Sequence, residues 1–261
     1  MILEINNLSV AYNSEKILVS ALNNINLYLE QGEILSVVGE SGSGKSTLAF
    51  SLLDLLPQDA QRKGEAYFKG ENIFCFKDKE MENLRGKRIG LIFQEPSVTF
   101  NPVLSISYQF QEILKTRMGI NSKEERIEIM VDLFKKVHLD GWKRILSSYP
   151  HQLSGGELQR IAIAMAVSFK PDILLCDEPT SSLDVTIESQ IIHLFKELKE
   201  TLGLTLLFIT HNLELARVLS DRVAVLHQGC LREVNNKQKL FDYPQDKYTK
   251  QLLSSFQELE G

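Results

Sequence analysis

The sequence predicts an α/β fold, in which a parallel core sheet follows an antiparallel β region and contains a helical insertion. Short apolar runs such as Ile34–Val38 and Ile173–Cys176 are typical of strands that are buried on both faces of a sheet. Helical patterns such as Ile187–Glu200 alternate with these runs, and this alternation favours parallel pairing. The length of 261 residues suits one large domain with an appended lobe, or two small domains.

The N-terminal region is predicted to pair as antiparallel strands. Leu3–Val10 and Asn24–Leu29 alternate apolar and polar side chains, which is typical of half-buried strands. The buried strand Ile34–Val38 comes next and runs into a glycine-rich loop. A helix is expected over Ser46–Leu56, where Pro57 ends it.

The middle of the chain is predicted to be helical, between two parts of the core. Tyr67–Gly70 resembles the tip of a hairpin, and Arg88–Phe93 is expected to be a further core strand. From about Pro102 to Ser148 apolar residues recur at helical spacing, which predicts an insertion of roughly 50 residues. Strands are then expected at Ile173–Cys176, Thr205–Ile209 and Val223–Leu226.

Composition argues against several classes of protein. The net charge of −5 argues against the broad basic surface of a nucleic-acid-binding protein. The longest apolar stretches are about half of the roughly 20 residues that a membrane-spanning helix needs. The N-terminus lacks the basic start and apolar core of a signal peptide, and the three cysteines lie far apart, without metal-ligand spacing. We therefore expect a cytoplasmic protein with no nucleic-acid partner.

Residues 39–46 fit the phosphate-binding pattern Gly-x-x-x-x-Gly-Lys-Ser/Thr without mismatch. Its glycines let backbone N–H groups surround phosphate oxygens, while Lys45 neutralises the β- and γ-phosphates and the Ser46 hydroxyl binds Mg²⁺. The alternative is a glycine-rich turn with a chance lysine, but the buried strand before it and the helix after it favour the loop. The residues expected to bind nucleotide here are Gly39, Ser41, Gly42, Ser43, Gly44, Lys45, Ser46 and Thr47.

Two carboxylates end the apolar strand at residues 173–176. Strand alternation would point Asp177 and Glu178 to different sides, so the two can have different roles. Asp177 suits the Mg²⁺ ligand shell, and Glu178 suits activation of the water that attacks the γ-phosphate. The alternative is that the two carboxylates are only the solvated acidic end of a strand. The phosphate loop in the same sequence favours the catalytic interpretation over this alternative.

A third motif runs from Leu153 to Arg160. Ser154 and Glu157 match a capping box, so a well-started helix over Gly155–Ser168 would explain them alone. A plain helix start does not explain glycines at 155 and 156, because each costs about 1 kcal/mol relative to alanine. Paired glycines expose backbone N–H groups to an anion such as a γ-phosphate.

These motifs, together with Gln94, Ser181–Asp184 and His211, occur in the order and approximate spacing of ATP-binding-cassette (ABC) ATPases. The resemblance covers nearly the whole chain, from about Ile2 to Leu253. It implies a P-loop NTPase domain of the ABC type with an N-terminal antiparallel β subdomain. The expected single domain, 1–261, has its catalytic core with the β subdomain over 1–100 and 151–235. A helical insertion over 101–150 extends into the signature helix, which is the helix Gly155–Ser168 that begins with the Ser-Gly-Gly motif. A C-terminal helical tail covers 236–261.

The resemblance also implies the roles of individual residues. Two such domains would pack head to tail, so that each ATP lies between one chain's phosphate loop and the other chain's Ser154, Gly155, Gly156 and Glu157. Gln94 would contact Mg²⁺ and the attacking water. His211 would hold the γ-phosphate, and Asp184 would act across the dimer.

Tyr12 and Glu157 each differ in one respect from the other motif residues. Tyr12 lies where the family places an aromatic residue that stacks on adenine, although a packed surface tyrosine is the alternative. Glu157 replaces the family's commonest glutamine and is still able to cap its helix.

Three further segments resemble peptide/nickel-type importer ATPases: Phe93–Pro102, Tyr149–Gln152 and Tyr248–Leu253. Asp246–Lys247 departs from the usual His-Pro before the last of these. The short tail favours the nickel or metal-chelate members over the peptide members. The resemblance implies a second ABC ATPase chain (identical or paralogous), two membrane permease subunits and an extracytoplasmic substrate-binding protein. It places the chain on the inner face of the cell membrane.

Two other classes of protein remain as alternatives. A soluble ABC ATPase that acts on nucleic acid or ribosomes usually has two cassettes, a long coiled coil or zinc cysteines, and the sequence has none of these. A small-molecule P-loop kinase would not need the Ser-Gly-Gly motif at 154–156. Selectivity for the transported substrate would lie in the partner subunits.

Overall fold

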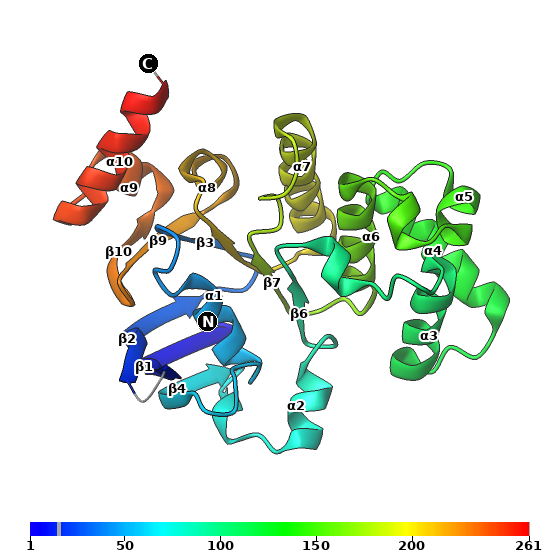
Figure 1. The fold of residues 1–261 in the computed structure, drawn as a ribbon, viewed down its shortest axis with the longest axis horizontal. Coiled ribbons are helices and arrows are strands. Elements are labelled where there is room, and N and C mark those ends of the chain that lie inside the picture. The colour runs from blue at the N-terminus through cyan, green and yellow to red at the C-terminus, as the bar shows by residue number, and fades with distance from the viewer. Residues whose placement is uncertain (15–16, 261) are drawn as a thin grey trace. The chain divides into compact units, whose positions relative to one another are not determined.

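The computed structural model describes residues 1–14 and 17–260. The chain divides into two compact units, labelled by element in Figure 1. Unit 1 consists of Met1–Arg85 and Leu204–Gly261, and unit 2 is the internal segment Gly86–Gly203. Among the described residues, none of the helices combines the length and the apolar composition needed to cross a membrane.

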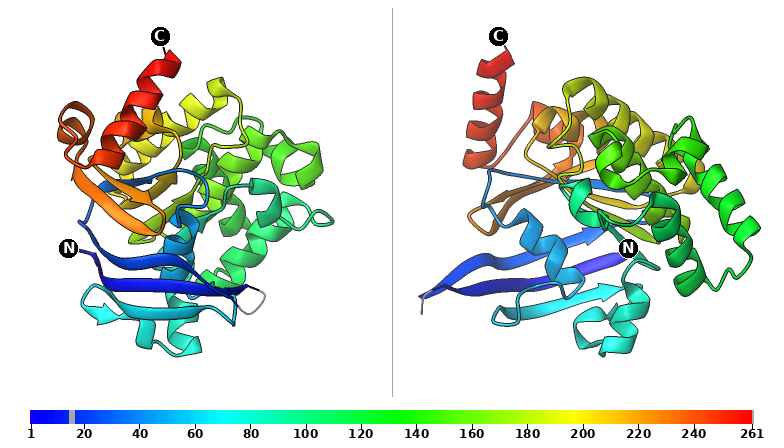
Figure 2. Two further views of the ribbon diagram at one scale, coloured as in Figure 1. Left: turned by 60° about the vertical axis from the view of Figure 1, so that its left-hand side comes forward. Right: turned by 45° about the vertical axis from the view of Figure 1, so that its right-hand side comes forward.

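Unit 1 contains an antiparallel sheet, which is seen from two further directions in Figure 2. Its strand order is β2-β1-β4-β5, and Leu3 of β1 lies opposite Leu29 of β2 and Phe68 of β4. Lys69 and Gly70 have φ values of 51° and 86° and form the two-residue turn between β4 and β5. Such turns need positive φ at both positions, so the predicted hairpin tip is confirmed. The four strands are β1 (Leu3–Ser14), β2 (Ile17–Leu29), β4 (Gln61–Phe68) and β5 (Glu71–Asn72).

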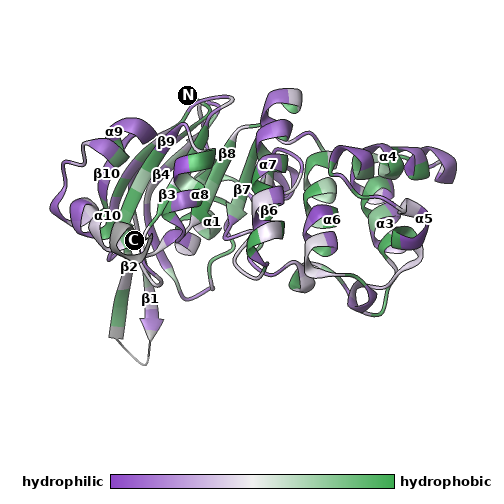
Figure 3. Cartoon of the chain, turned by 90° about the horizontal axis from the view of Figure 1, so that it is seen from above, coloured by the Kyte–Doolittle hydropathy of each residue, from purple (hydrophilic) through white to green (hydrophobic). Residues whose placement is uncertain are grey.

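Unit 1 also holds parallel strands built from the predicted apolar runs. β3 (Ile34–Val38) pairs in parallel with β8 (Leu206–Thr210) and with β9 (Arg222–His227), and all residues of β3 and β8 are buried. Figure 3 shows these strands as hydrophobic. β10 (Cys230–Asn236) adds an antiparallel strand beside β9, which the sequence analysis did not predict. The helices of this unit are α1 (Lys45–Leu52), α2 (Asp78–Leu84), α8 (Leu213–Leu219), α9 (Lys237–Asp242) and α10 (Lys247–Glu260).

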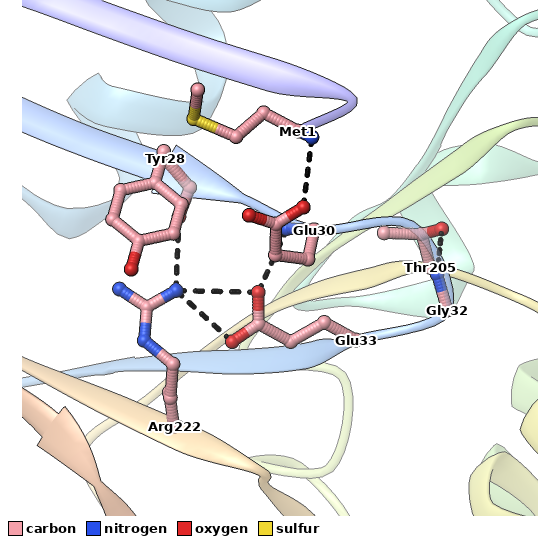
Figure 4. A network of polar contacts seen from close by, with 7 residues as sticks. All are labelled: Met1, Tyr28, Glu30, Gly32, Glu33, Thr205 and Arg222. Atoms are coloured by element: carbon pink, nitrogen blue, oxygen red, sulfur yellow. Dashed lines mark hydrogen bonds and ion pairs between the residues drawn. The ribbon is translucent and has the colours of Figure 1, made fainter.

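A polar network joins the antiparallel strands to β3 within unit 1 (Figure 4). Arg222 Nη1 donates to both carboxylate oxygens of Glu33, at 3.1 and 3.3 Å, and the guanidinium lies 4.1 Å from the centre of the Tyr28 ring. Glu33 also accepts a hydrogen bond of 2.8 Å from the Glu30 N–H. Because Glu33 is 8% exposed, this pairing satisfies a nearly buried charge at the start of β3.

The helix predicted at Ser46–Leu56 is shorter than expected, because α1 ends at Leu52. The Leu55 N–H bonds to the Phe50 carbonyl at 2.9 Å, and Asp54 adopts a left-handed φ of 52°. Side chains from later in the chain also bind carbonyls at this end: Arg62 donates to Ser51 at 2.8 Å, and Arg85 donates to Leu53 at 2.6 Å. These partners satisfy carbonyls that a further helical turn would otherwise have paired.

Unit 2 combines a parallel strand pair with helices. β6 (Ile89–Ile92) pairs with β7 (Ile173–Asp177) in the register Ile92 to Cys176. Ser105 and Ser122 cap the first two helices of the unit, and Gly119 ends the first with a left-handed φ of 72°. The predicted helical insertion is confirmed as three helices, and the predicted helix Gly155–Ser168 is found with the same bounds. The helices are α3 (Ile106–Met118), α4 (Lys123–Lys136), α5 (Trp142–Ser147), α6 (Gly155–Ser168) and α7 (Val185–Leu202).

Candidate functional site

The glycine-rich loop connects β3 to α1 in unit 1 and is closely packed at two of its glycines. A Cβ at Gly39 would lie 2.1 Å from the Leu226 carbonyl oxygen, and one at Gly44 would lie 2.4 Å from that of Ala21. Gly44 also has a φ of 105°, in the region that glycine alone adopts readily. The loop is held from outside by the Gly229 N–H, which donates to the Ser43 carbonyl at 2.9 Å.

The loop contains polar groups suited to an anion. Lys45 is 4% exposed, and its Nζ donates to the Gly39 and Glu40 carbonyls at 2.8 and 2.9 Å. The buried Ser43 hydroxyl has no hydrogen-bond partner within residues 1–14 and 17–260. Buried hydroxyls are normally paired, so this orphaned group beside a buried cation fits a phosphate oxygen. The first turn of α1 contains no acidic residue that would oppose an anion at the helix start.

His211 lies at the same sheet edge as the loop. β3 and β8 are parallel neighbours, and Val38 of β3 is paired with Thr210 of β8. Gly39 directly follows Val38, and His211 directly follows Thr210, so the two residues leave neighbouring strands at the same level. Ligands of open α/β sheets bind beyond the carboxyl ends of the strands, so the two segments share the expected binding edge. The His211 side chain is exposed.

Tyr12 of β1 lies beside the helix that follows the loop. Its hydroxyl donates a hydrogen bond of 3.1 Å to Thr47 Oγ1, and its side chain is half-buried. This contact places one end of the ring at the first turn of α1 and leaves part of the side chain accessible.

Unit 2 brings Gln94, Asp177 and Glu178 to one edge of its strand pair. Because Ile92 is paired with Cys176, Gln94 and Asp177 follow the carboxyl ends of neighbouring parallel strands. Asp177 is 4% exposed, Glu178 is half-buried and Gln94 is exposed. β7 ends at Asp177, so the alternation expected to separate the two carboxylates does not reach Glu178. A left-handed φ of 46° sets the direction of Glu178 instead, which is an uncommon conformation for a residue with a side chain.

The predicted capping box at the start of α6 is confirmed. Ser154 Oγ accepts a hydrogen bond of 3.3 Å from the Glu157 N–H, and Glu157 Oε2 accepts one of 2.9 Å from the Ser154 N–H. Arg144 of α5 forms an ion pair with Glu157, a contact that the spacing of residues in the sequence did not indicate. Partial burial raises the pKa of Glu157, but the Ser154 and Arg144 hydrogen bonds outweigh it and lower the pKa overall.

The two glycines of this motif have a packing role that sequence reasoning missed. A Cβ at Gly156 would lie 2.8 Å from Ile187 Cγ2, and one at Gly155 would lie 3.3 Å from Leu183 Cδ2. Asp184 caps α7 by accepting a 3.0 Å hydrogen bond from the Ile187 N–H, and its side chain is exposed. The glycines therefore let α6 begin close to the start of α7.

The predicted Mg²⁺ ligands are all oxygen donors. The described residues contain no group of three or more His, Cys, Asp or Glu side chains arranged to hold a metal ion. Mg²⁺ commonly binds one or two protein carboxylates and takes further ligands from phosphates and water. Taken one by one, the Ser46 hydroxyl of unit 1 and the Gln94 amide oxygen and nearly buried Asp177 carboxylate of unit 2 are each a kind of oxygen donor that Mg²⁺ accepts.

Substituting Gly44 with alanine is expected to destabilise the loop more than the same change at Gly42. Both positions have left-handed φ values, which cost alanine about 1–2 kcal/mol. A Cβ at Gly44 would in addition overlap backbone, whereas a Cβ at Gly42 would meet nothing within 4 Å. Urea denaturation of both variants measures the difference. Equal losses of unfolding free energy would show that the Ala21 contact is not restrictive.

Comparison with known proteins gives one family match and several relatives that are similar over nearly the whole of this chain. Residues 22–181 match the family model described as ABC transporter. The chain is 38% identical to the oligopeptide transport ATP-binding protein OppD of Bacillus subtilis, covering 100% of the chain and 73% of OppD. It is 38% identical to the dipeptide transport ATP-binding protein DppD of the same organism, covering 99% of the chain and 78% of DppD. The uncharacterized ABC transporter ATP-binding protein YejF of Escherichia coli is 41% identical over 97% of the chain, which spans 48% of YejF.

Solved structures are similar at the level of the fold. A dimeric structure of the ATP-binding cassette MJ0796, in a post-hydrolysis state bound to ADP and Pi, has a TM-score of 0.79 at 32% identity, covering 90% of this chain and 98% of the other. The structure of cbiO1 from Clostridium perfringens, part of the transporter complex cbiONQ, has a TM-score of 0.77 at 26% identity and covers 93% and 91% of the two chains.

Proposed function

The chain belongs to the ABC transporter family, and from that premise we propose that it is the ATP-binding and ATP-hydrolysing subunit of an importer. The observation that carries this proposal is the phosphate loop. It combines close-packed glycines, a buried Lys45 and an orphaned Ser43 hydroxyl at the sheet edge where His211 follows β8. Such a constellation binds a nucleoside triphosphate through backbone N–H groups and one cation.

In unit 1 the proposed roles concern nucleotide binding. The N–H groups of residues 39–47 surround the phosphates, and Lys45 exchanges its two carbonyl acceptors for phosphate oxygens. His211 contacts the γ-phosphate, and Tyr12 stacks on adenine from its position beside Thr47. Ser46 is the Mg²⁺ ligand proposed in this unit, and Mg²⁺, when bound, would neutralise charge at the phosphates. The other two proposed ligands, Gln94 and Asp177, belong to unit 2.

In unit 2 the proposed roles concern hydrolysis. Glu178 accepts a proton from the attacking water, and the left-handed backbone at residue 178, just after β7, sets the direction of its side chain. Gln94 positions that water and responds to the γ-phosphate. Its place after β6 lets the same glutamine transmit nucleotide state to the segment that follows it.

We infer that two ATPase chains, identical or paralogous, form the working unit. Each nucleotide would then lie between one chain's phosphate loop and the other chain's residues 154–157, with Asp184 acting across the interface. The start of α6 supports this. Its capping box pairs the Glu157 N–H, while helix geometry leaves the Gly155 and Gly156 N–H groups without an acceptor inside α6, at the positive end of the helix dipole. The similar cassette MJ0796 forms dimers, one of them with ADP and Pi bound.

The segment after Gln94 is the proposed contact with membrane permeases. Val98, Val103 and Tyr108 are 68%, 75% and 56% exposed, so apolar side chains accumulate on one short stretch of unit 2. Exposed apolar groups that lie close together are typical of protein interfaces. This stretch would couple the ATPase to two permease subunits at the inner face of the cell membrane, with an extracytoplasmic binding protein supplying the substrate.

We propose peptides as the transported class. OppD and DppD are named for oligopeptide and dipeptide transport, and both are similar over nearly the entire chain. Nickel and metal chelates, the other substrates considered from the sequence, are not named in either relative. The alternative of a soluble ABC ATPase on nucleic acid or ribosomes would require a basic surface, which a net charge of −5 opposes.

The test reconstitutes the chain with a candidate permease pair in vesicles and supplies a substrate-binding protein loaded with peptide. We expect Mg²⁺-dependent ATP hydrolysis that increases on addition of the peptide-loaded protein, and vesicles without permeases control for the coupling. Hydrolysis that responds to ribosomes or nucleic acid, and not to any permease pair, would support the alternative.

Replacing Tyr12 with alanine is expected to weaken ATP binding by about 1–3 kcal/mol, the scale of base–aromatic stacking. Tyr12→Phe keeps the ring and loses only the hydrogen bond to Thr47, so it is expected to bind ATP nearly normally. Inorganic triphosphate, which has no base, is expected to bind all three proteins equally. Calorimetric titration measures these affinities, and an unchanged ATP affinity of Tyr12→Ala would leave Tyr12 with a packing role only.

A further inference from the structure

The C-terminal helix α10 contacts the phosphate loop through one side chain. Tyr248, the second residue of α10, stacks on His227 at the end of β9, with ring centroids 3.7 Å apart and an angle of 26° between the planes. β9 and its neighbour β10 lie beside α10 in Figure 1. His227 follows Leu226, whose carbonyl oxygen is the close neighbour of Gly39 in the loop. The Tyr248–His227 pair is therefore one residue away from the backbone contact between Leu226 and Gly39, where the loop begins.

The hydroxyl of Tyr248 is close enough to Glu40, the second residue of the loop, for the Glu40 carboxylate to act on it electrostatically. The hydroxyl is buried, and none of the described residues forms a hydrogen bond of good geometry with it. Burial, followed by the Glu40 carboxylate, raises the pKa of Tyr248 to about 12. The Glu40 carbonyl accepts hydrogen bonds from Lys45 Nζ at 2.9 Å and from the Ser43 N–H at 3.2 Å. A displacement of Glu40 would thus reach the two polar groups that we assign to phosphate binding.

α10 has anchors that do not depend on Tyr248. Asp246, which precedes α10, accepts hydrogen bonds of 2.8 and 3.2 Å from the N–H groups of Tyr248 and Thr249. Glu233 of β10 accepts a further bond of 2.9 Å from the Asp246 N–H. Leu252, one turn further along α10, packs against the apolar cluster that contains Val38, Val225 and Leu253. The helix can therefore stay docked when the Tyr248 ring is removed.

We propose that Tyr248 is a positioning residue for the phosphate loop, whose stack on His227 fixes the loop at Glu40 and couples nucleotide binding to the docking of α10. The proposal rests on the proposed function, because it assigns a support to the same nucleotide site. Tyr248 does not itself contact nucleotide in this account. Its effect passes through Glu40 to Lys45, so it acts on affinity and leaves the hydrolytic groups of unit 2 unchanged.

Coupling of this kind is reciprocal. If the docked helix favours the nucleotide-binding loop, bound nucleotide must favour the docked helix by the same factor. Amide exchange of α10 is therefore expected to slow when nucleotide binds to the wild-type chain, and the slowing is expected to be lost in Tyr248→Ala.

The test measures binding of Mg²⁺·ADP by calorimetry and the KM and kcat for ATP, on the full chain. Tyr248→Ala is expected to raise the ADP dissociation constant and the KM about three- to tenfold, the scale of an aromatic pair, with kcat retained. Tyr248→Phe keeps the stack and is expected to stay within about twofold of the wild type. Leu252→Ala is the matched control, because Leu252 packs from the same helix against the same apolar cluster, whose described members do not include His227 or Glu40.

A double-mutant cycle tests the route through His227. His227→Ala is expected to weaken ADP binding like Tyr248→Ala, and the double variant is expected to be no weaker than either single variant. Additive losses, an equal loss in Leu252→Ala, or a Tyr248→Phe variant as weak as Tyr248→Ala would overturn the proposal. If the wild-type chain binds no ADP at all, the proposed function fails first, so the two failures are distinguishable.

Discussion

Glu178→Gln is expected to reduce ATP hydrolysis by about 10²–10⁴-fold, the scale on which general-base assistance acts. Glutamine has nearly the same shape as glutamate and cannot accept the proton of the attacking water. The left-handed backbone at residue 178 is independent of the carboxylate charge, so the variant is expected to fold normally. The nucleotide-binding groups of unit 1 are untouched, so ATP binding is expected to persist, and ATP is expected to trap the dimer.

Steady-state phosphate release measures the rate, and size-exclusion chromatography with Mg²⁺·ATP measures the dimer. Glu200→Gln is a matched control, since it removes one negative charge from an exposed position on α7. The control is expected to hydrolyse ATP at the wild-type rate. Near-normal turnover by purified Glu178→Gln would remove Glu178 from the proposed catalytic role.

Features of the fold that are encoded locally were predicted well from the sequence. The strand predicted at Ile34–Val38 has the same bounds as β3, and the one predicted at Ile173–Cys176 is one residue shorter than β7. Continuous apolar runs define such strands because both faces are buried. The turn at Lys69 and Gly70 was likewise predicted from adjacent residues.

Features set by distant residues were not predicted. The helix α1 stops at Leu52, four residues before the predicted end, and two of the carbonyls there are bound by Arg62 and Arg85. Pro57 indicates a helix end in the sequence, but no pattern shows which side chains will fold back onto the helix. The edge strand β10 was missed because it is only partly buried and lacks an apolar run.

In the candidate site, too, features that depend on nearby residues were predicted, and features that depend on distant residues were not. The bonds between Ser154 and Glu157 span three residues, so the capping box could be predicted from spacing. The contact of Gly156 with Ile187 spans 31 positions of the chain, and it supplies a packing reason for a glycine that the sequence explained by anion binding alone. The direction of Glu178 depends on a backbone conformation for which residue periodicity contains no signal.

The second large effect is expected at Ser154. Ser154→Arg is expected to abolish most ATP hydrolysis while leaving the chain folded, because it places a bulky side chain at the helix start that would face the partner's γ-phosphate. Loss of the N-cap at α6 costs about 1 kcal/mol, which a domain tolerates. Ser122→Arg is a matched control: Ser122 caps α4 through a 3.2 Å bond from the Glu125 N–H and has no proposed role in nucleotide binding. Ser122→Arg is expected to lose similar stability and to keep its hydrolysis.

Mixing experiments show whether the Ser154 defect acts in the partner's site. A symmetric dimer has two composite sites, each with one chain's Lys45 and the other chain's Ser154. In a mixed dimer of Ser154→Arg and Lys45→Ala chains, one site has both defects and the other has neither. Two inactive preparations are therefore expected to regain part of the wild-type hydrolysis when they are combined, up to about one quarter if mixed dimers form at random and each intact site works alone. Absence of recovery, with mixed dimers demonstrated by differential tags, would mean that the sites are not shared or that both must hydrolyse together. A chain that stays monomeric with ATP in the Glu178→Gln background would instead require a paralogous partner, and the same mixture with that paralogue then becomes the test of the shared site.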